Sequence, residues 1–300
     1  MIRNSSPMLA IAVLSFAIFD IRAVEAASQT LEKIRELGKI TLGYREASIP
    51  FAYLGANQEP TGLSLDLCSA VADELRFQLH RPGLEIEYVA VNASNRIPLL
   101  QNGTIDIECG STTNTADRQK HVSFSVATYV ASPRWLVSGP SSVVELNGLD
   151  GQSIVVTQGS LNLAVAKKVI DDLKLKVTVI QAKDHAESLL MLKTGRAAAW
   201  FEDDILVAGL VANSLDPKVF RMLAATYEPS YYGLMTRSED PEFKAIVDSV
   251  IKNKMGSGEF DKLYSKWFES PIPPRGHNLQ LPMSDAMKAR VASPSDALTP

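Results

Sequence analysis

The sequence is poor in the residues that build metal sites and disulfide frameworks. Its 300 residues include only two cysteines, Cys68 and Cys109, and four scattered histidines. The cysteine spacing fits no zinc motif, so neither a metal site nor a cofactor is predicted. Two cysteines can form one disulfide or none, and both possibilities stay open at this point.

Strong charge and long apolar runs are also missing. The formal net charge is only −4, with 21% charged and 46% hydrophobic residues. Such mild acidity argues against a nucleic-acid partner. No repeat stands out, and no stretch beyond the N-terminal region is apolar for long enough to be a membrane helix. The composition is that of a globular protein large enough for two lobes.

The N-terminal region has the pattern of an export signal. Arg3 precedes an apolar run from Met8 to Phe19, and small residues follow at Ala23, Ala26 and Ala27. A charged start, a short apolar centre and a small-residue exit are typical of a secretory signal peptide. We therefore predict a signal peptide over residues 1–26 and a periplasmic mature protein. Cleavage after Ala23 or after Ala27 is the alternative.

Helical and strand patterns alternate along the rest of the chain. Strands are predicted at Lys39–Gly43, Leu84–Val91, Ile105–Cys109, Val177–Gln181, Ala197–Phe201 and Tyr231–Met235. Helices are predicted at Leu31–Leu37, Leu63–Leu79, Ile97–Gln101, Leu161–Leu173, Asp184–Leu192, Pro241–Met255 and Gly258–Phe268, with a short one near Ser284–Arg290. This rhythm predicts open α/β sheets, which bind ligands beyond the carboxyl ends of their strands.

Polar groups gather at these predicted strand ends. Arg96 and Arg118 bracket a strand and a cluster of hydroxyl residues, Ser111, Thr112 and Thr113. An arginine guanidinium matches the geometry of a carboxylate, so the stretch suits recognition of a small acid. The alternative is that both arginines lie on the surface and the hydroxyl residues cap a helix. Gly159–Ser160 opens a helix, which is either an anion site or a plain cap. The acidic run Glu202–Asp204 is either a helix start or an ammonium receptor.

Four segments together carry a family resemblance: GYREASIPF, NRIPLLQNGTIDIECGSTTN, AKDH and KWFESPIPP. The chain resembles the periplasmic amino-acid-binding proteins of ABC importers, solute-binding protein family 3, and within them the acidic-amino-acid subgroup. The resemblance implies a two-lobed α/β fold of the type II periplasmic-binding-protein class with two crossing hinge strands. Lobe 1 would comprise residues 27–131 and 234–300, and lobe 2 residues 132–233.

The resemblance also implies the function and the residues that carry it. A monomer would bind L-glutamate or L-aspartate and deliver it to a membrane ABC permease. Arg118 would hold the α-carboxylate with help from Ser111, Thr113 and the Ser160 helix start, and Asp203 would receive the α-ammonium. Arg45, Arg96 and His185 would hold the side-chain carboxylate, with Ser94 beside them. A neutral amino acid would leave two of these positive charges without a negative partner, and an unpaired charge costs free energy in a buried site.

Some positions depart from the subgroup and keep alternatives open. Leu161 stands where a threonine is common, and Leu234 stands where relatives have a cysteine that can pair with the Cys109 position. Cys109 is therefore either free or bonded to Cys68, and glutamine or asparagine remain possible ligands. A second function is an enzyme on the same scaffold, a dehydratase of cyclic carboxylic acids with Glu46 or Glu108 as general acid. A membrane-linked sensor domain is a third, which the lack of a following membrane segment disfavours.

Overall fold

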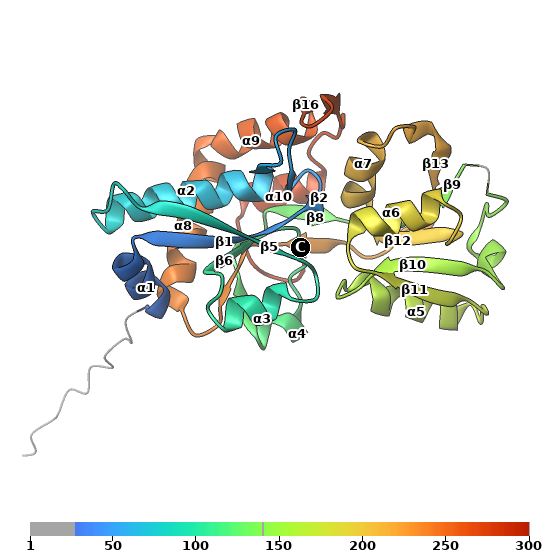
Figure 1. The fold of residues 1–300 in the computed structure, drawn as a ribbon, viewed down its shortest axis with the longest axis horizontal. Coiled ribbons are helices and arrows are strands. Elements are labelled where there is room, and N and C mark those ends of the chain that lie inside the picture. The colour runs from blue at the N-terminus through green and yellow to red at the C-terminus, as the bar shows by residue number, and fades with distance from the viewer. Residues whose placement is uncertain (1–27, 140, 300) are drawn as a thin grey trace, which may run out of the picture.

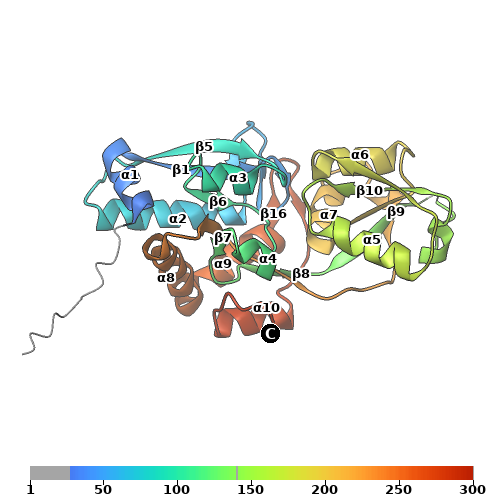
Figure 2. The same cartoon turned by 90° about the horizontal axis from the view of Figure 1, so that it is seen from below.

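The computed structural model describes residues 28–139 and 141–299. The predicted signal peptide lies outside these residues. The described chain forms two α/β lobes that lie side by side (Figure 1), each around a five-stranded sheet. The second view shows the same two bodies joined by a narrow waist near β8 (Figure 2). No helix in the described part of the chain combines the length and apolarity that crossing a membrane requires.

The first sheet has the strand order β5-β1-β6-β15-β7. Its strands are β1 (Lys39–Arg45), β5 (Glu85–Val91), β6 (Ile107–Cys109), β7 (Val122–Phe124) and β15 (Met235–Arg237). β1 pairs in parallel with both β5 and β6, so these three strands end at the same edge. β15 arrives from much later in the chain and pairs antiparallel with β6 and β7.

Helices cover both faces of the first sheet (Figure 1). They are α1 (Gln29–Leu37), α2 (Leu63–Gln78), α3 (Arg96–Gln101), α4 (Ala116–Gln119), α8 (Pro241–Ser257) and α9 (Glu259–Phe268). α2, α8 and α9 pack together over one core, whereas Leu100 of α3 belongs to a separate core with Val91 and Met235. α1 begins at the cap Ser28, whose hydroxyl accepts the Leu31 N–H, and ends at Gly38 with a left-handed φ of 67°.

The second sheet has the order β11-β10-β12-β9-β13. Its strands are β9 (Pro133–Ser138), β10 (Ser153–Thr157), β11 (Thr178–Ala182), β12 (Ala199–Asp203) and β13 (Phe220–Met222). The helices of this lobe are α5 (Asn162–Asp172), α6 (His185–Lys193) and α7 (Asp204–Ala212). Short 3₁₀ turns lie at Leu146–Leu149 and Pro217–Val219. Side chains alternate along β10: Ile154 and Val156 join the core under α5, whereas Val155 joins the core under α6 and α7. Both faces of the sheet are therefore buried around its parallel strands β10, β11 and β12.

Two short antiparallel strands connect the lobes. β8 (Tyr129–Ala131) pairs with β14 (Ser230–Tyr232), with Tyr231 opposite Val130. The single strand predicted at Tyr231–Met235 is wrong, because the chain leaves this pair at Gly233 and joins the first sheet as β15. The Gly233 N–H donates to the Thr112 carbonyl at that point instead of continuing the ladder.

A disulfide and an aromatic cluster stiffen the first lobe beside the crossing strands. Cys68 of α2 is bonded to Cys109 at the end of β6, which settles the pairing that the sequence left open. The rings of Phe51, Tyr129, Tyr232, Tyr264 and Phe268 pack on one another, with Tyr129 stacked on Phe268 at 5.1 Å. The crossing strands are thus anchored in a rigid apolar core.

The remaining elements are short. They are β2 (Ala47–Ser48), β3 (Ala52–Leu54), β4 (Pro60–Thr61), β16 (Pro271–Ile272), β17 (His277–Asn278) and α10 (Asp285–Ala292). β2, β3 and β4 form a small sheet between β1 and α2. β2 also packs against α6 and α7, so this excursion brings the first lobe into contact with the second.

Candidate ligand-binding site

A small cavity of about 10 Å³ lies between the two lobes, where the strands of both sheets end. Its lining is divided evenly between the lobes: Arg45, Ala93, Arg96, Ser111, Thr113 and Arg118 come from the first, and Ser160, Leu161, His185, Glu202, Asp203 and Leu206 from the second. β1, β5 and β6 end on one side, and β10, β11 and β12 end on the other. Parallel sheets commonly bind ligands at this edge.

The structure brings together eight of the nine residues that the sequence analysis selected. Ser94 is the exception, because its side chain is exposed while that of its neighbour Ala93 lines the cavity. Asn92 Oδ1 accepts the backbone N–H groups of both Ser94 and Asn95 in a tight turn after β5. Ser94 is exposed in this turn and does not line the cavity.

Arg45 and Arg96 form the most buried positive charges of the cavity. Each is about 3% exposed. Burial lowers the pKa of Arg45 to about 10, with repulsion from Arg96 as the next cause, and burial also lowers the pKa of Arg96. Arg96 Nε and Ser111 Oγ are fully buried and have no hydrogen-bond partner among the described residues. Unfilled donors on a desolvated cation make this end of the cavity suited to an anion.

Glu108 lies behind these arginines and is fully buried. The Thr112 hydroxyl donates to its Oε2 at 2.8 Å, and its charge favours the protonated forms of Arg45 and Arg96. Gly110 permits this close packing, because a Cβ at that position would overlap Glu108 Oε1 and lie 3.0 Å from Arg45 Cγ. Glu108 is therefore the carboxylate that most favours the charged forms of these two guanidinium groups.

Arg118 spans the cavity from one lobe to the other. Its Nη1 donates to the Thr113 carbonyl at 2.8 Å, and its Nη2 donates to the Gly159 carbonyl of the second lobe at 3.3 Å. Burial and the repulsion of Arg96 lower its pKa to about 9, so it stays protonated at neutral pH. Two carbonyl contacts use only part of the five-donor fork and leave donors for a ligand.

The second lobe contributes a pair of buried carboxylates at the end of β12. Asn162 Nδ2 donates to Glu202 Oε1 and to Asp203 Oδ1, and the Tyr232 hydroxyl donates to Asp203 Oδ2. Burial, followed by the repulsion of Glu202, raises the pKa of Asp203 to about 7. A cation placed beside Asp203 would relieve both effects, so this carboxylate suits an ammonium group.

The Ser160 turn differs from the predicted arrangement. The helix α5 begins at Asn162 rather than at Ser160, and the Ser160 N–H donates to the Thr157 carbonyl at 3.1 Å. The Ser160 hydroxyl meanwhile accepts the Asn162 N–H. Ser160 lines the cavity, but its own backbone N–H is used within the turn.

Sequence reasoning did not select Glu202 as a site residue, and it named Glu108 only as a general acid in the enzymatic alternative. Glu202 is 1% exposed and lines the cavity, yet in the sequence it is simply the first member of the run Glu202–Asp204. All five residues of β12 are buried, so the strand has no alternation that could have indicated the burial of this acid. Within the described residues no three His, Cys, Asp or Glu side chains converge as a metal site would require.

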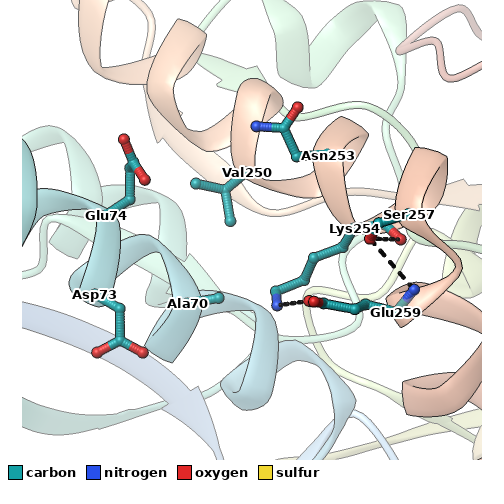
Figure 3. Close-up of a pocket in the computed structure, with 8 residues that line it drawn as sticks. All are labelled: Ala70, Asp73, Glu74, Val250, Asn253, Lys254, Ser257 and Glu259. Carbon is teal, nitrogen blue, oxygen red and sulfur yellow. Dashed lines mark hydrogen bonds and ion pairs between the residues drawn. The ribbon is translucent and has the colours of Figure 1, made fainter.

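A second hollow lies on the first lobe between α2, α8 and the start of α9 (Figure 3). It is lined by Ala70, Asp73, Glu74, Val250, Asn253, Lys254, Ser257 and Glu259. Lys254 is paired with Glu259 at 2.8 Å, and Asp73 and Glu74 of α2 point away from each other. No strand ends there and no buried group is left without a partner, so the inter-lobe cavity is the better candidate.

Comparisons with known proteins agree with this geometry. The family model described as bacterial extracellular solute-binding proteins, family 3, matches residues 40–270. A Pseudomonas aeruginosa protein named L-glutamate/L-aspartate-binding protein is 43% identical over 268 residues, which cover 89% of each chain. An Escherichia coli protein named glutamate/aspartate import solute-binding protein is 38% identical over 274 residues, which cover 91% of each.

Solved structures share the same two-lobed fold. An ancestral amino acid-binding protein, described as a precursor of cyclohexadienyl dehydratase, superimposes with a TM-score of 0.69 at 27% identity, covering 79% of this chain and 99% of its own. The predicted family and fold class are confirmed. The chain belongs to the bacterial extracellular solute-binding proteins of family 3.

Proposed function

We propose that this protein is a receptor that captures L-glutamate or L-aspartate outside the cytoplasm and presents it to the permease of an ABC importer. The observation that carries the proposal is the cavity itself, which is lined by three arginines, two of them buried, and by Asp203, whose pKa is raised by burial. The printed names of relatives at 38% and 43% identity support the same ligand class.

The amino-acid backbone of the ligand would occupy the Arg118 end of the cavity. Arg118 would bind the α-carboxylate with its free N–H groups, and Ser111 and Thr113 would contribute hydroxyl or backbone contacts. Ser160 would contribute its hydroxyl rather than its backbone N–H, which Thr157 already accepts. Asp203 would receive the α-ammonium and regain full ionisation in doing so.

The remaining charges favour a second carboxylate on the ligand. Glu202 Oε1 accepts hydrogen bonds from Asn162 and from the Asp203 N–H, and its Oε2 lies 3.3 Å from His185 Nδ1. Glu108, followed by Glu202, favours the protonated forms of Arg45 and Arg96, yet Arg96 Nε has no hydrogen-bond partner among the described residues. An uncompensated buried charge is costly, and a side-chain carboxylate would neutralise it.

The lobes would close on the ligand by bending at β8 and β14. We place lobe 1 at residues 27–131 and 234–300 and lobe 2 at residues 132–233. The chain enters the second lobe through β8 and returns to the first through β14, and these two strands pair with each other between the two sheets. A ligand that touches both lobes stabilises the closed form, and a permease can distinguish that form from the open one. We further propose that the protein is exported through a signal peptide cleaved near Ala26. We also propose that it binds its ligand as a monomer.

The enzymatic alternative receives less support from the geometry. An ancestral relative is a precursor of a dehydratase, and such an activity would need a general acid facing the ligand. Glu46 is exposed, and Glu108 lies behind the arginines, so neither candidate lines the cavity. A binding protein without catalytic activity is therefore the proposed function.

Calorimetric titration with glutamate, aspartate, glutamine and asparagine tests the proposal. The protein is first unfolded and refolded to remove any ligand retained from the cell. We expect micromolar or tighter binding of a dicarboxylic amino acid, about −8 kcal/mol or better, and no binding of any of the four by Arg118→Ala. Tighter binding of the amides than of the acids, or turnover of prephenate or arogenate, would contradict it.

A further inference from the structure

The C-terminal segment of the chain, residues 284–299, lies against the hinge strands. The family model ends at residue 270, so this segment lies beyond the part of the chain that the family model describes. It begins with α10, whose Met287 is fully buried in the core of the first lobe. α10 lies beside the crossing strand β8 (Figure 2). The segment therefore starts as a fixed part of the first lobe.

Arg290 of α10 joins the rest of the segment to the other crossing strand. It is 5% exposed, and its Cζ lies 4.4 Å from the centre of the Tyr231 ring in β14. Its Nη2 donates to the carbonyls of Ala297 and Thr299. One buried cation thus contacts the end of the tail and a hinge strand at the same time.

Further contacts fix the tail to the first lobe. The Ser295 carbonyl accepts the Ala127 N–H at 2.9 Å. The Asp296 carbonyl accepts an N–H of Asn114 Nδ2 at 2.9 Å, and the Asp296 carboxylate pairs with Lys244 of α8 at 3.1 Å. The tail must therefore move with the first lobe when the hinge bends.

Leu298 of this tail and side chains of the second lobe line one apolar pocket of about 330 Å³. The second lobe contributes Leu161, which caps α5, and Val165 within α5, and both are half-buried. Leu161 and Thr113 of the first lobe line both this pocket and the ligand cavity. Opening of the ligand cavity moves Leu161 away from Thr113, so it widens the apolar pocket as well.

The apolar surfaces on the two sides of this pocket come close together only when the lobes are closed. Leu298 is 36% exposed in this structure, so most of its side chain is already covered. Opening would return part of the Leu298 and α5 surfaces to water, which costs free energy. A contact that is made in one form only shifts the balance towards that form.

We propose that residues 284–299 are a strap that favours the closed form of the protein: Arg290 holds the strap on the hinge, and Leu298 packs against α5 when the lobes are closed. The strap acts on the lobes and not on the ligand, so its effect does not depend on which amino acid the cavity binds.

Cross-linking of the ligand-free protein tests the strap without any amino acid. Glu46→Cys and Lys183→Cys replace exposed residues of opposite lobes that line one hollow beside Arg45. A short bifunctional thiol reagent joins these cysteines in the closed form, and Cys68 and Cys109 do not compete because they form a disulfide. We expect Leu298→Ser to lower the cross-linking rate about fivefold, because the rate follows the closed population. An unchanged rate would overturn the inference.

Two matched variants separate the strap from a general loss of apolar surface. Leu298→Met keeps an apolar side chain of similar size and should cross-link at the wild-type rate. Leu215→Ser removes a leucine that is 76% exposed and lines neither cavity, and it should also have no effect. Slowing of the reaction by Leu215→Ser to the same extent as by Leu298→Ser would overturn the inference.

Affinity for glutamate distinguishes failure of the strap from failure of the proposed function. We expect Leu298→Ser to raise the Kd for glutamate about fivefold and Leu298→Met to leave it unchanged. An equal Kd in Leu298→Ser and in the wild-type protein would overturn the inference. If the wild-type protein binds no amino acid, the proposed function is contradicted, and the cross-linking rates still decide whether the strap exists.

Discussion

At the scale of single residues, the site is a set of buried charges that a ligand would complete. Asp203 is the clearest case, because burial and the neighbouring Glu202 together raise its pKa to about 7. Its ionised form therefore costs free energy in the empty site. A ligand ammonium favours the ionised form, so binding and loss of the Asp203 proton are thermodynamically linked.

This linkage predicts that affinity falls as the pH drops. Below pH 7 an increasing share of Asp203 is protonated and must release its proton before the ammonium binds. We expect the Kd for glutamate to be about tenfold higher at pH 6 than at pH 8, where affinity levels off. Titration in buffers of different ionisation enthalpy should show close to one proton released per ligand at pH 6. Binding that stays constant over this range would contradict the assigned role.

The sequence predicted these residues unevenly, for physical reasons. Arg45, Arg96 and Asp203 stand at or just beyond strand ends, so an α/β pattern places them at one edge even without a structure. Glu202 lies within a strand that is buried on both faces, where an acid is unexpected and strand periodicity gives no signal. The positions of Ser94 and of the Ser160 N–H depend on turn geometry, which residue types alone do not determine.

At the scale of elements, the close approach of α7 to the loop after β2 governs how the lobes meet. Gly209, in the middle of α7, lies against the Ile49 carbonyl, and a Cβ there would overlap that group. Glycine is otherwise unfavourable within a helix by about 1 kcal/mol relative to alanine. A glycine at position 209 is explained if the contact between α7 and the Ile49 carbonyl is needed when the two lobes are closed.

Gly209→Ala is therefore expected to separate stability from binding. The ligand-free variant should unfold at the same or a slightly higher temperature, because alanine favours the helix. Its Kd for glutamate should rise at least about tenfold, because the added methyl group opposes closure. Gly256→Ala in α8 is the control, since a Cβ there meets no atom within 4 Å. An unchanged Kd in Gly209→Ala would mean that closure does not need this contact.

The disulfide between α2 and β6 should contribute to stability rather than to recognition. It joins residues 41 positions apart on the core side of the first lobe. Removing such a link costs up to about 4 kcal/mol of unfolding free energy, mainly through the entropy of the unfolded chain. The variant Cys68→Ala/Cys109→Ala should show a clearly lower urea midpoint and a glutamate Kd within a few-fold of wild type. An unchanged midpoint would contradict this account.

Elements with local signals were predicted well, and those set by distant contacts were not. α1 and α8 carry a capping residue and a terminal glycine, and their observed bounds lie within about two residues of the predicted ones. The disulfide and the division of β14 from β15 depend on which strand lies beside which in the folded lobe. Neither is encoded in a short window of sequence.

At the scale of the whole molecule, the two lobes bring together charges that neither lobe could stabilise alone. The first lobe supplies all three arginines, and the second supplies Glu202 and Asp203. Among the described residues, hydrogen bonds across the cavity join Arg118 to Gly159 and Arg45 to His185. Closure without ligand would therefore leave an excess positive charge at the Arg45 end, and a dicarboxylic ligand would remove it.

Comparison of glutamate and glutamine binding by the wild-type protein and Arg96→Ala tests this central claim most directly. The two ligands have nearly the same shape and differ by one negative charge. We predict that the refolded wild-type protein prefers glutamate by about 100-fold or more and that Arg96→Ala loses most of this preference, because glutamine binding changes far less. Equal losses of affinity for glutamate and glutamine would show that Arg96 does not bind the side-chain carboxylate of the ligand, and would contradict the account.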